Sequence, residues 1–144
     1  MVNQPKMKIN RLVILARHLR TIATRVPTVE GRGAKVRGFN LHSWFGTRLR
    51  GATRADYASR DCGTTACAFG EATYIPEFKA LGLKRAGRGV RFGKELDMDA
   101  AAKFFGLKYS DANRLFNPVQ YATGQRGPLD VVTKIEELIT RPGA

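Results

Sequence analysis

The chain is poor in the residue types that build covalent frameworks, membrane spans and metal sites. Its 144 residues include two cysteines and two histidines. Two thiols do not provide the disulfide framework of a small secreted domain, so we expect a reducing compartment. Every apolar run stays well short of the roughly 20 residues that cross a bilayer, and no membrane span is expected. The basic, then apolar start lacks a small-residue cleavage site, which argues against a secretory signal.

Acidic residues are also scarce, above all in the first part of the chain. Twelve Asp and Glu stand against 25 Lys and Arg, which gives a net charge of +13. Residues 1–60 hold 13 of these cations and two acids, and residues 79–94 hold no acid at all. Such an excess either serves solubility or indicates an anionic partner, namely nucleic acid or an acidic protein surface.

What the sequence does contain is a set of short apolar segments with helical spacing. Apolar residues recur at three and four positions over 6–26 and over 128–140, which predicts a first and a last helix. Residues 61–78 are mostly small and apolar, and they predict a buried helical spine capped by Thr64 or Thr65. With this length and composition, we expect a single, mainly α domain of about five helices.

Residues 97–117 carry the pattern of two helices joined by a glycine turn. Asp97 or Asp99 is expected to cap the first helix, Gly106 to end it, and Ser110 to cap the second. This spacing is shared by helix-turn-helix motifs and by purely structural corners. Because the second helix is short and carries one arginine, the sequence favours a structural corner over a DNA reader.

Residues 28–60 and 82–96 are basic, rich in glycine and without helical periodicity, so we expect partly irregular loops there. Such loops can order on a polyanion, although a solvated face is the plainer interpretation. Trp44 is expected to anchor the first loop on the core rather than to stack on a base. If the corner reads bases, Asn113 and Arg114 would contact them. The candidate phosphate-binding cations are Arg32, Lys35, Arg37, Arg48, Arg50, Arg54, Arg60, Lys84, Arg85, Arg88 and Arg91.

Few residues offer catalytic or metal-binding chemistry. Cys62 and Cys67 are expected to be buried and inert. A thiol nucleophile paired with His42 is the enzymatic alternative, and His18 is expected at the rim of its helix. The four Cys and His residues lack the close pairs of a zinc site. We therefore expect a protein that is not an enzyme and uses no metal or cofactor.

Several motifs, taken in order along the chain, resemble those of a known family. They are FNLHSW from Phe39, CGTTACAFGEATYIPEFKALGL from Cys62, AAKFFGL from Ala101, LFNPVQY from Leu115, and the closing helix. Over about residues 9–140 the chain resembles a family of small uncharacterised proteins of tailed bacteriophages and prophages. The basic stretches 48–60 and 85–94 look particular to this chain. The resemblance implies a phage origin and a place in the bacterial cytoplasm or the virion, and it implies no activity.

These observations predict a non-enzymatic phage accessory protein that binds an anionic partner. The simplest partner is nucleic acid, bound without strong sequence specificity. The alternative is a protein-binding module that engages a host factor or a phage structural protein through its basic face. Salt-sensitive binding to DNA would separate the two hypotheses.

Overall fold

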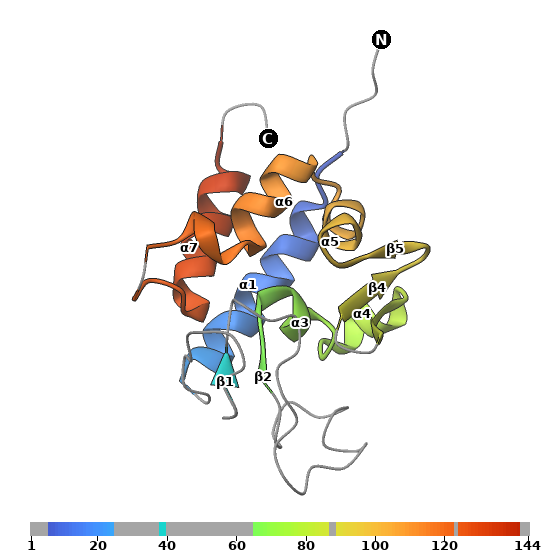
Figure 1. Ribbon diagram of the computed structural model, residues 1–144, viewed down its shortest axis with the longest axis horizontal. Coiled ribbons are helices and arrows are strands. Elements are labelled where there is room, and N and C mark those ends of the chain that lie inside the picture. Colours follow the sequence, from blue (N-terminus) through green and yellow to red (C-terminus); the bar gives the residue numbers. More distant parts are fainter. Residues whose placement is uncertain (1–5, 25–37, 40–64, 87–88, 123, 142–144) are drawn as a thin grey trace, which may run out of the picture.

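The computed structural model describes residues 6–24, 38–39, 65–86, 89–122 and 124–141. This part of the chain contains six α-helices and one short 3-10 helix (Figure 1). They are α1 (Ile9–Ala23), α3 (Ala68–Ala72), α4 (Pro76–Ala80), α5 (Asp97–Phe105), α6 (Tyr109–Phe116), the 3-10 helix η1 (Pro118–Gln120) and α7 (Pro128–Ile139). The expectation of a mainly α protein is confirmed. Of the first basic stretch, 28–60, only 38–39 are described, so Trp44 and His42 lie outside the described residues.

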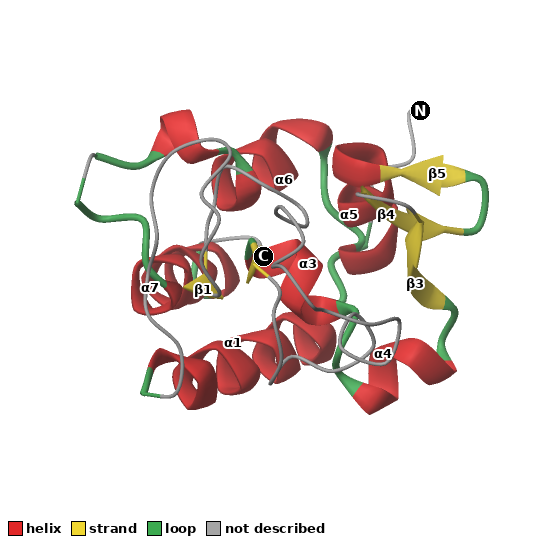
Figure 2. Cartoon of the chain, turned by 60° about the horizontal axis from the view of Figure 1, so that its bottom comes forward, coloured by secondary structure: helices red, strands yellow, loops and turns green. Residues whose placement is uncertain are grey.

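The expectation of an irregular loop over 82–96 is wrong. These residues form a three-stranded antiparallel sheet of β3 (Leu83–Ala86), β4 (Gly89–Phe92) and β5 (Glu95–Leu96), in that order. Two further short strands, β1 (Gly38–Phe39) and β2 (Thr65–Ala66), pair in parallel. Figure 2 shows the three-stranded sheet at one end of the molecule, beside α5 and α4.

The sheet forms because its residues alternate between the core and the solvent. Leu83 and Val90 are buried, whereas Lys84 and Arg91, the next residues along, are exposed. This period of two is the strand signal, and Gly93 supplies the turn between β4 and β5. At the turn between β4 and β5, Gly93 has a φ of +61°, which a residue with a side chain rarely adopts.

Buried side chains form one continuous core between α1, the central helices and α7. The packing of α1 against α7 is the most extensive helix contact among the described elements, and both views place the two helices side by side (Figures 1 and 2). Every residue of α3 is buried, so the predicted spine over 61–78 is confirmed as a buried helix for 68–72 only, while 65–66 form β2 and 61–64 lie outside the described residues. Five phenylalanines fill the centre: Phe69, Phe78, Phe104, Phe105 and Phe116. Within the described residues, no helix combines the length and apolar character that crossing a membrane requires.

Three predicted helix caps are wrong. The cap of α3 is Cys67, whose sulfur accepts a hydrogen bond from the Gly70 N–H at 3.4 Å. Thr65 does not cap this helix because it belongs to β2. Asp97 is the first residue of α5, and its carboxylate accepts from the Val90 N–H at 3.0 Å instead of capping its own helix. Ser110 lies inside the first turn of α6, which begins one residue earlier after Lys108.

The corner between α5 and α6 is built as predicted, on Gly106. This residue has a φ of +65°, and its backbone N–H still bonds to carbonyls of the last turn of α5. The start of α1 closes the same helix end, since the Lys8 N–H donates to the Phe105 carbonyl at 2.8 Å. Arg11 donates to the Phe104 carbonyl at 2.7 Å and lies over the Phe104 ring at 4.6 Å. The corner is therefore locked against the first helix.

Candidate nucleic-acid interface

Two cations face each other on the exposed side of the sheet. Lys84 of β3 and Arg91 of β4 are directly opposite in the antiparallel register, and both are exposed. Like charges at opposed positions destabilise a strand pair, so the fold gains nothing from this arrangement. The Nε of Arg91 donates to the Gly93 carbonyl at 2.9 Å, which directs this side chain toward the turn between β4 and β5.

A third cation reaches the same turn from α5. A Cβ built on Gly93 would lie 3.7 Å from the Nζ of Lys103, so the ammonium group lies close to the turn. Lys94, the next residue along the chain, is exposed as well. α5 packs on the inner side of β4 and β5, opposite the side that carries Lys84 and Arg91, so Lys103 meets the cations of the sheet at the turn. The cations of the sheet are thus continued onto the surface of α5.

Beyond Lys103, further cations lie at the start of α1, in a groove that also holds two acidic residues. Lys6, Lys8 and Lys103 line one open groove of about 450 Å³. The remaining lining residues are Glu95, Asp99, Ala102, Gly106 and Leu107. We call the six cations the basic strip. Its members are Lys84, Arg91, Lys94, Lys103, Lys8 and Lys6.

Of the eleven cations that the sequence predicted to bind phosphate, the structure describes three, and two of these lie in the basic strip. Lys84 and Arg91 belong to the basic strip. Arg85 is half-buried and shares the inner side of the sheet with Val90, its partner in the register. The other eight candidates lie outside the described residues: Arg32, Lys35, Arg37, Arg48, Arg50, Arg54, Arg60 and Arg88.

The two candidate base-contacting residues lie away from the strip, on α6. The Asn113 side-chain oxygen accepts from the Asn117 side-chain amide at 2.9 Å, so this acceptor is already engaged. Arg114 lines a cavity of about 60 Å³ together with Lys134 and Glu137 of α7 and the ion pair described next. These contacts fit the structural corner that the sequence favours.

An ion pair fixes α6 to the end of α7 at this cavity. Both Asp111 oxygens accept from the Arg141 guanidinium, at 3.1 and 3.2 Å. This pairing raises the pKa of Arg141, which keeps its charge at all accessible pH values. Burial lowers the pKa of Lys134, and the neighbouring Arg114 adds to that effect. Two carboxylates compensate most of the charge of the three cations in this cluster, which suits packing better than phosphate binding.

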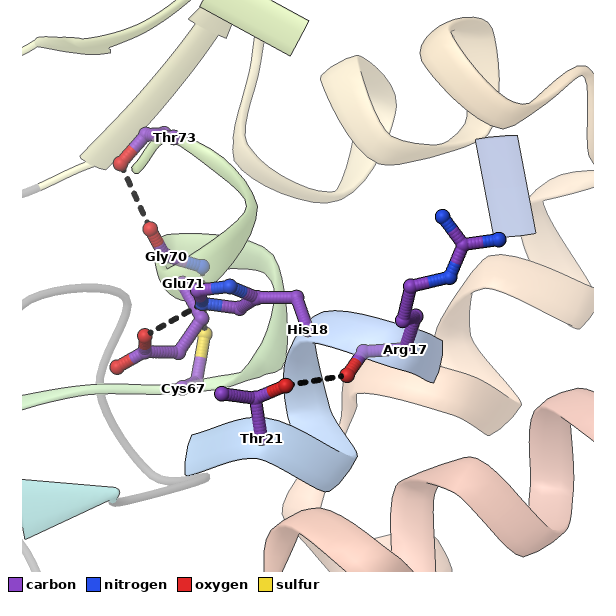
Figure 3. Close-up of polar contacts among 7 residues, drawn as sticks. All are labelled: Arg17, His18, Thr21, Cys67, Gly70, Glu71 and Thr73. Carbon is purple, nitrogen blue, oxygen red and sulfur yellow. Dashed lines mark hydrogen bonds and ion pairs between the residues drawn. The ribbon is translucent and has the colours of Figure 1, made fainter. Parts of the chain in front are cut away.

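A second polar cluster lies between α1 and α3 (Figure 3). The His18 Nε2 lies 3.1 Å from the Oε1 of Glu71, a carboxylate with an exposed fraction of 0%. The sequence placed His18 at a helix rim and missed this pairing, since Glu71 lies in a run of small residues that gives no sign of it. A hydrogen-bonding partner on a buried carboxylate offsets part of the penalty of burial.

Cys67 adjoins this cluster and is buried, as predicted for it. Burial raises the pKa of its thiol to about 12, against the opposing effect of the Gly70 and Phe69 backbone groups. Because the thiolate is the nucleophilic form, this thiol is a poor candidate for catalysis at neutral pH. In the described part of the chain, no three His, Cys, Asp or Glu residues come together as metal ligands. Cys62 lies outside the described residues.

Sequence reasoning missed Lys6, Lys8 and Lys103 as members of one surface. The turn at Gly106 brings them together, because the Lys6 backbone passes so close that a Cβ on Gly106 would lie 1.9 Å from the Lys6 carbonyl oxygen. This contact brings together residues about a hundred positions apart in the sequence, and no local sequence pattern predicts it. Comparisons of the chain with protein-family models, with curated proteins and with solved structures find no match.

Proposed function

We propose that the protein is a non-enzymatic nucleic-acid-binding protein that holds the phosphate backbone along the basic strip. The observation that carries the proposal is the opposed pair Lys84 and Arg91 on the solvent side of the sheet. Two cations held side by side repel each other in the free protein, and a phosphate between them would relieve that repulsion. The strip continues over Lys103 to Lys6, so an extended polyanion fits it better than a single small anion.

The overall charge supports the same proposal. A net charge of +13 attracts polyanions over a distance of about 10 Å at 0.1 M salt. Contacts to phosphates carry no base information, so binding is expected to be largely independent of sequence. On the resemblance to small phage proteins, we propose further that it acts as an accessory factor of a phage, in the cytoplasm of a bacterial host or in a virion.

The test compares neutralised variants by fluorescence anisotropy with labelled DNA and RNA at two salt concentrations. The double variant Lys84→Gln/Arg91→Gln is expected to bind every sequence more weakly and to flatten the salt dependence. Each lost phosphate contact removes about 0.7–0.9 from the slope of log K against log salt. Arg17→Gln/Lys79→Gln removes the same charge from exposed positions of α1 and α4 outside the strip, so it is the matched control. Equal losses in both double variants would mean that net charge alone drives binding.

A second candidate function is binding to an acidic protein surface. Leu96 is opposite Arg91 in the register of β4 and β5, and 54% of it is exposed. An exposed leucine beside cations suits a protein partner better than a phosphate backbone. Undetectable binding to DNA and to RNA at about 50 mM salt, where phosphate contacts are strongest, would favour this candidate.

A further inference from the structure

The groove at the end of the basic strip has mixed charge, unlike the rest of the strip. Glu95 and Asp99 line it together with Lys6, Lys8 and Lys103. Among the described residues, none of these five side chains forms an ion pair or a side-chain hydrogen bond with another. Asp99 also lies in the first turn of α5, where a negative charge favours the helix. The groove therefore offers both cations and acceptors to a ligand.

The carboxylates of Glu95 and Asp99 limit which chemical groups of a nucleic acid can bind in this groove. A phosphate at about 4 Å from a carboxylate is repelled by roughly 1 kcal/mol in water and by more near a protein surface. The favourable partner for a carboxylate is a hydrogen-bond donor, and in nucleic acids the donors include the amino groups of the bases. In a duplex one hydrogen of each such amino group is engaged in the base pair and the other lies in a groove, whereas in a single strand the whole edge is free.

An exposed aromatic residue follows the groove-lining segment in the chain. Tyr109 follows the groove residue Leu107 by two positions, and 57% of it is exposed. Its neighbour Lys108 is exposed too. Aromatic rings among cations are the usual platform for unpaired bases, which stack on them regardless of sequence. A tyrosine at the first position of α6 has no part in the described core, so packing does not account for it.

We infer that the nucleic acid held by the basic strip is single-stranded, with bases entering the groove toward Glu95 and Asp99 and stacking on Tyr109. This inference rests on the proposed function, and it adds the class of ligand. The lysines of the groove take the phosphates on either side of the bases. Cytosine is favoured over thymine, because cytosine presents an amino donor where thymine presents a carbonyl acceptor.

The first test uses labelled single strands of about 12 nucleotides, within the span of known single-strand sites, and the duplex of the same sequence. The single strand is expected to bind more tightly than the duplex. Tyr109→Ala is expected to weaken single-strand binding at least about fivefold, the lower end of the effect of losing one stacked base. Tyr109→Phe keeps the ring and should restore the affinity, whereas a purely electrostatic site would not distinguish the two variants.

The second test compares oligo-dC with oligo-dT. In the parent protein dC is expected to bind more tightly, and in Glu95→Ala/Asp99→Ala the ratio of the two affinities is expected to fall toward one. If the carboxylates only repel phosphates, the double variant binds both strands more tightly and the ratio stays unchanged, which overturns the inference. A duplex bound as tightly as the single strand, with no effect of Tyr109→Ala, overturns it as well. Binding to neither form overturns the proposed function itself.

Discussion

At the scale of single residues, Gly106 is the glycine in the described part of the chain where an added Cβ would come closest to another atom. A Cβ there would lie 1.9 Å from the Lys6 carbonyl oxygen and 2.9 Å from the Lys6 carbonyl carbon, both in the main chain. Backbone atoms cannot rotate away from an added Cβ as the end of a flexible side chain can. Gly124 offers the matched control, because it also has a positive φ and a Cβ there would meet nothing within 4 Å.

We predict that Gly106→Ala destabilises the protein distinctly more than Gly124→Ala. Both variants place alanine in the left-handed region, which costs about 1–2 kcal/mol. Only Gly106→Ala must also displace the start of α1 from the end of α5. Free energies of unfolding from urea titrations measure the difference. Equal losses would show that the Lys6 backbone moves away without cost.

The buried thiol of Cys67 and the buried phenol of Tyr121 predict that the protein loses stability in alkaline solution. Burial raises the pKa of Cys67 from 9.0 to about 12, and burial also raises the pKa of Tyr121 above its ordinary value of 10.0. Above about pH 9 the unfolded chain releases the thiol proton while the folded chain keeps it. The folded state then binds more protons, so stability is complete below pH 9 and falls as the pH rises toward 12.

The expected slope for one such group is about 1.4 kcal/mol per pH unit. Cys67→Ala should flatten the decline of unfolding free energy that begins near pH 9, whatever it does to stability at neutral pH. Tyr121→Phe should flatten the part that begins near pH 10, although it also removes the hydrogen bond to the Leu115 carbonyl. An unchanged slope in Cys67→Ala would mean that the thiol ionises in the folded state.

At the scale of elements, Asp97 joins the sheet to α5. It is the one residue other than glycine with a positive φ in the described part of the chain, at +52°. Its carboxylate accepts from the Val90 N–H, and a Cβ on Gly89 would lie 2.4 Å from the same oxygen. The carboxylate thus holds the start of β4 where Gly89 leaves room for it.

We predict that Asp97→Ala costs about 1–3 kcal/mol, since it leaves the Val90 N–H without its acceptor and keeps the backbone strain. Asp97→Asn should cost much less, because asparagine tolerates a positive φ and retains an acceptor oxygen. Thermal unfolding compares the two, and hydrogen exchange of the Val90 amide reports the bond directly. Fast exchange in the parent protein would show that the bond does not form.

The elements that the sequence predicted are those whose signals are local. The periodicity of α1 and α7 and the glycine end of α5 need no distant partner, and all three were expected. The sheet was missed because its strands have at most four residues and carry charges and glycines. It is held by packing on α5, where Phe92 meets Phe104 edge to face at 5.0 Å between ring centroids. Such a contact is tertiary, and propensity does not contain it.

In the candidate site, too, the sequence indicated what local features determine and missed what depends on tertiary contacts. Lys84 and Arg91 stood out by their charge, but their opposition across a strand pair depends on a register that the sequence did not show. Three lysines of the strip lie in a helix or just before one, namely Lys6, Lys8 and Lys103. Exposed lysines are common at such positions, so the sequence did not mark them as part of a site. Only the closure of α1 on the end of α5 unites them. The basic strip is therefore a product of the fold more than of any motif.

At the scale of the whole molecule, the net charge of +13 predicts opposite effects of salt on the free protein and on its complex. In the free protein like charges repel one another, and this self-repulsion weakens the folded state. Raising the salt from about 10 to 300 mM shortens the screening length from roughly 30 Å to less than 8 Å, so the melting temperature should rise. A bound polyanion adds stability by mass action, but its affinity falls steeply with salt.

The melting temperature of the free protein should therefore rise with salt, while the extra stabilisation given by an added DNA strand should shrink. The two melting curves, with and without DNA, are expected to converge at high salt. A melting scan at five salt concentrations, each with and without excess DNA, measures both trends on one sample. Lys84→Gln/Arg91→Gln should raise the low-salt melting temperature of the free protein, because it removes the repulsion across the strand pair, and should reduce the stabilisation by DNA. A stabilisation that does not depend on salt would contradict binding through phosphate contacts.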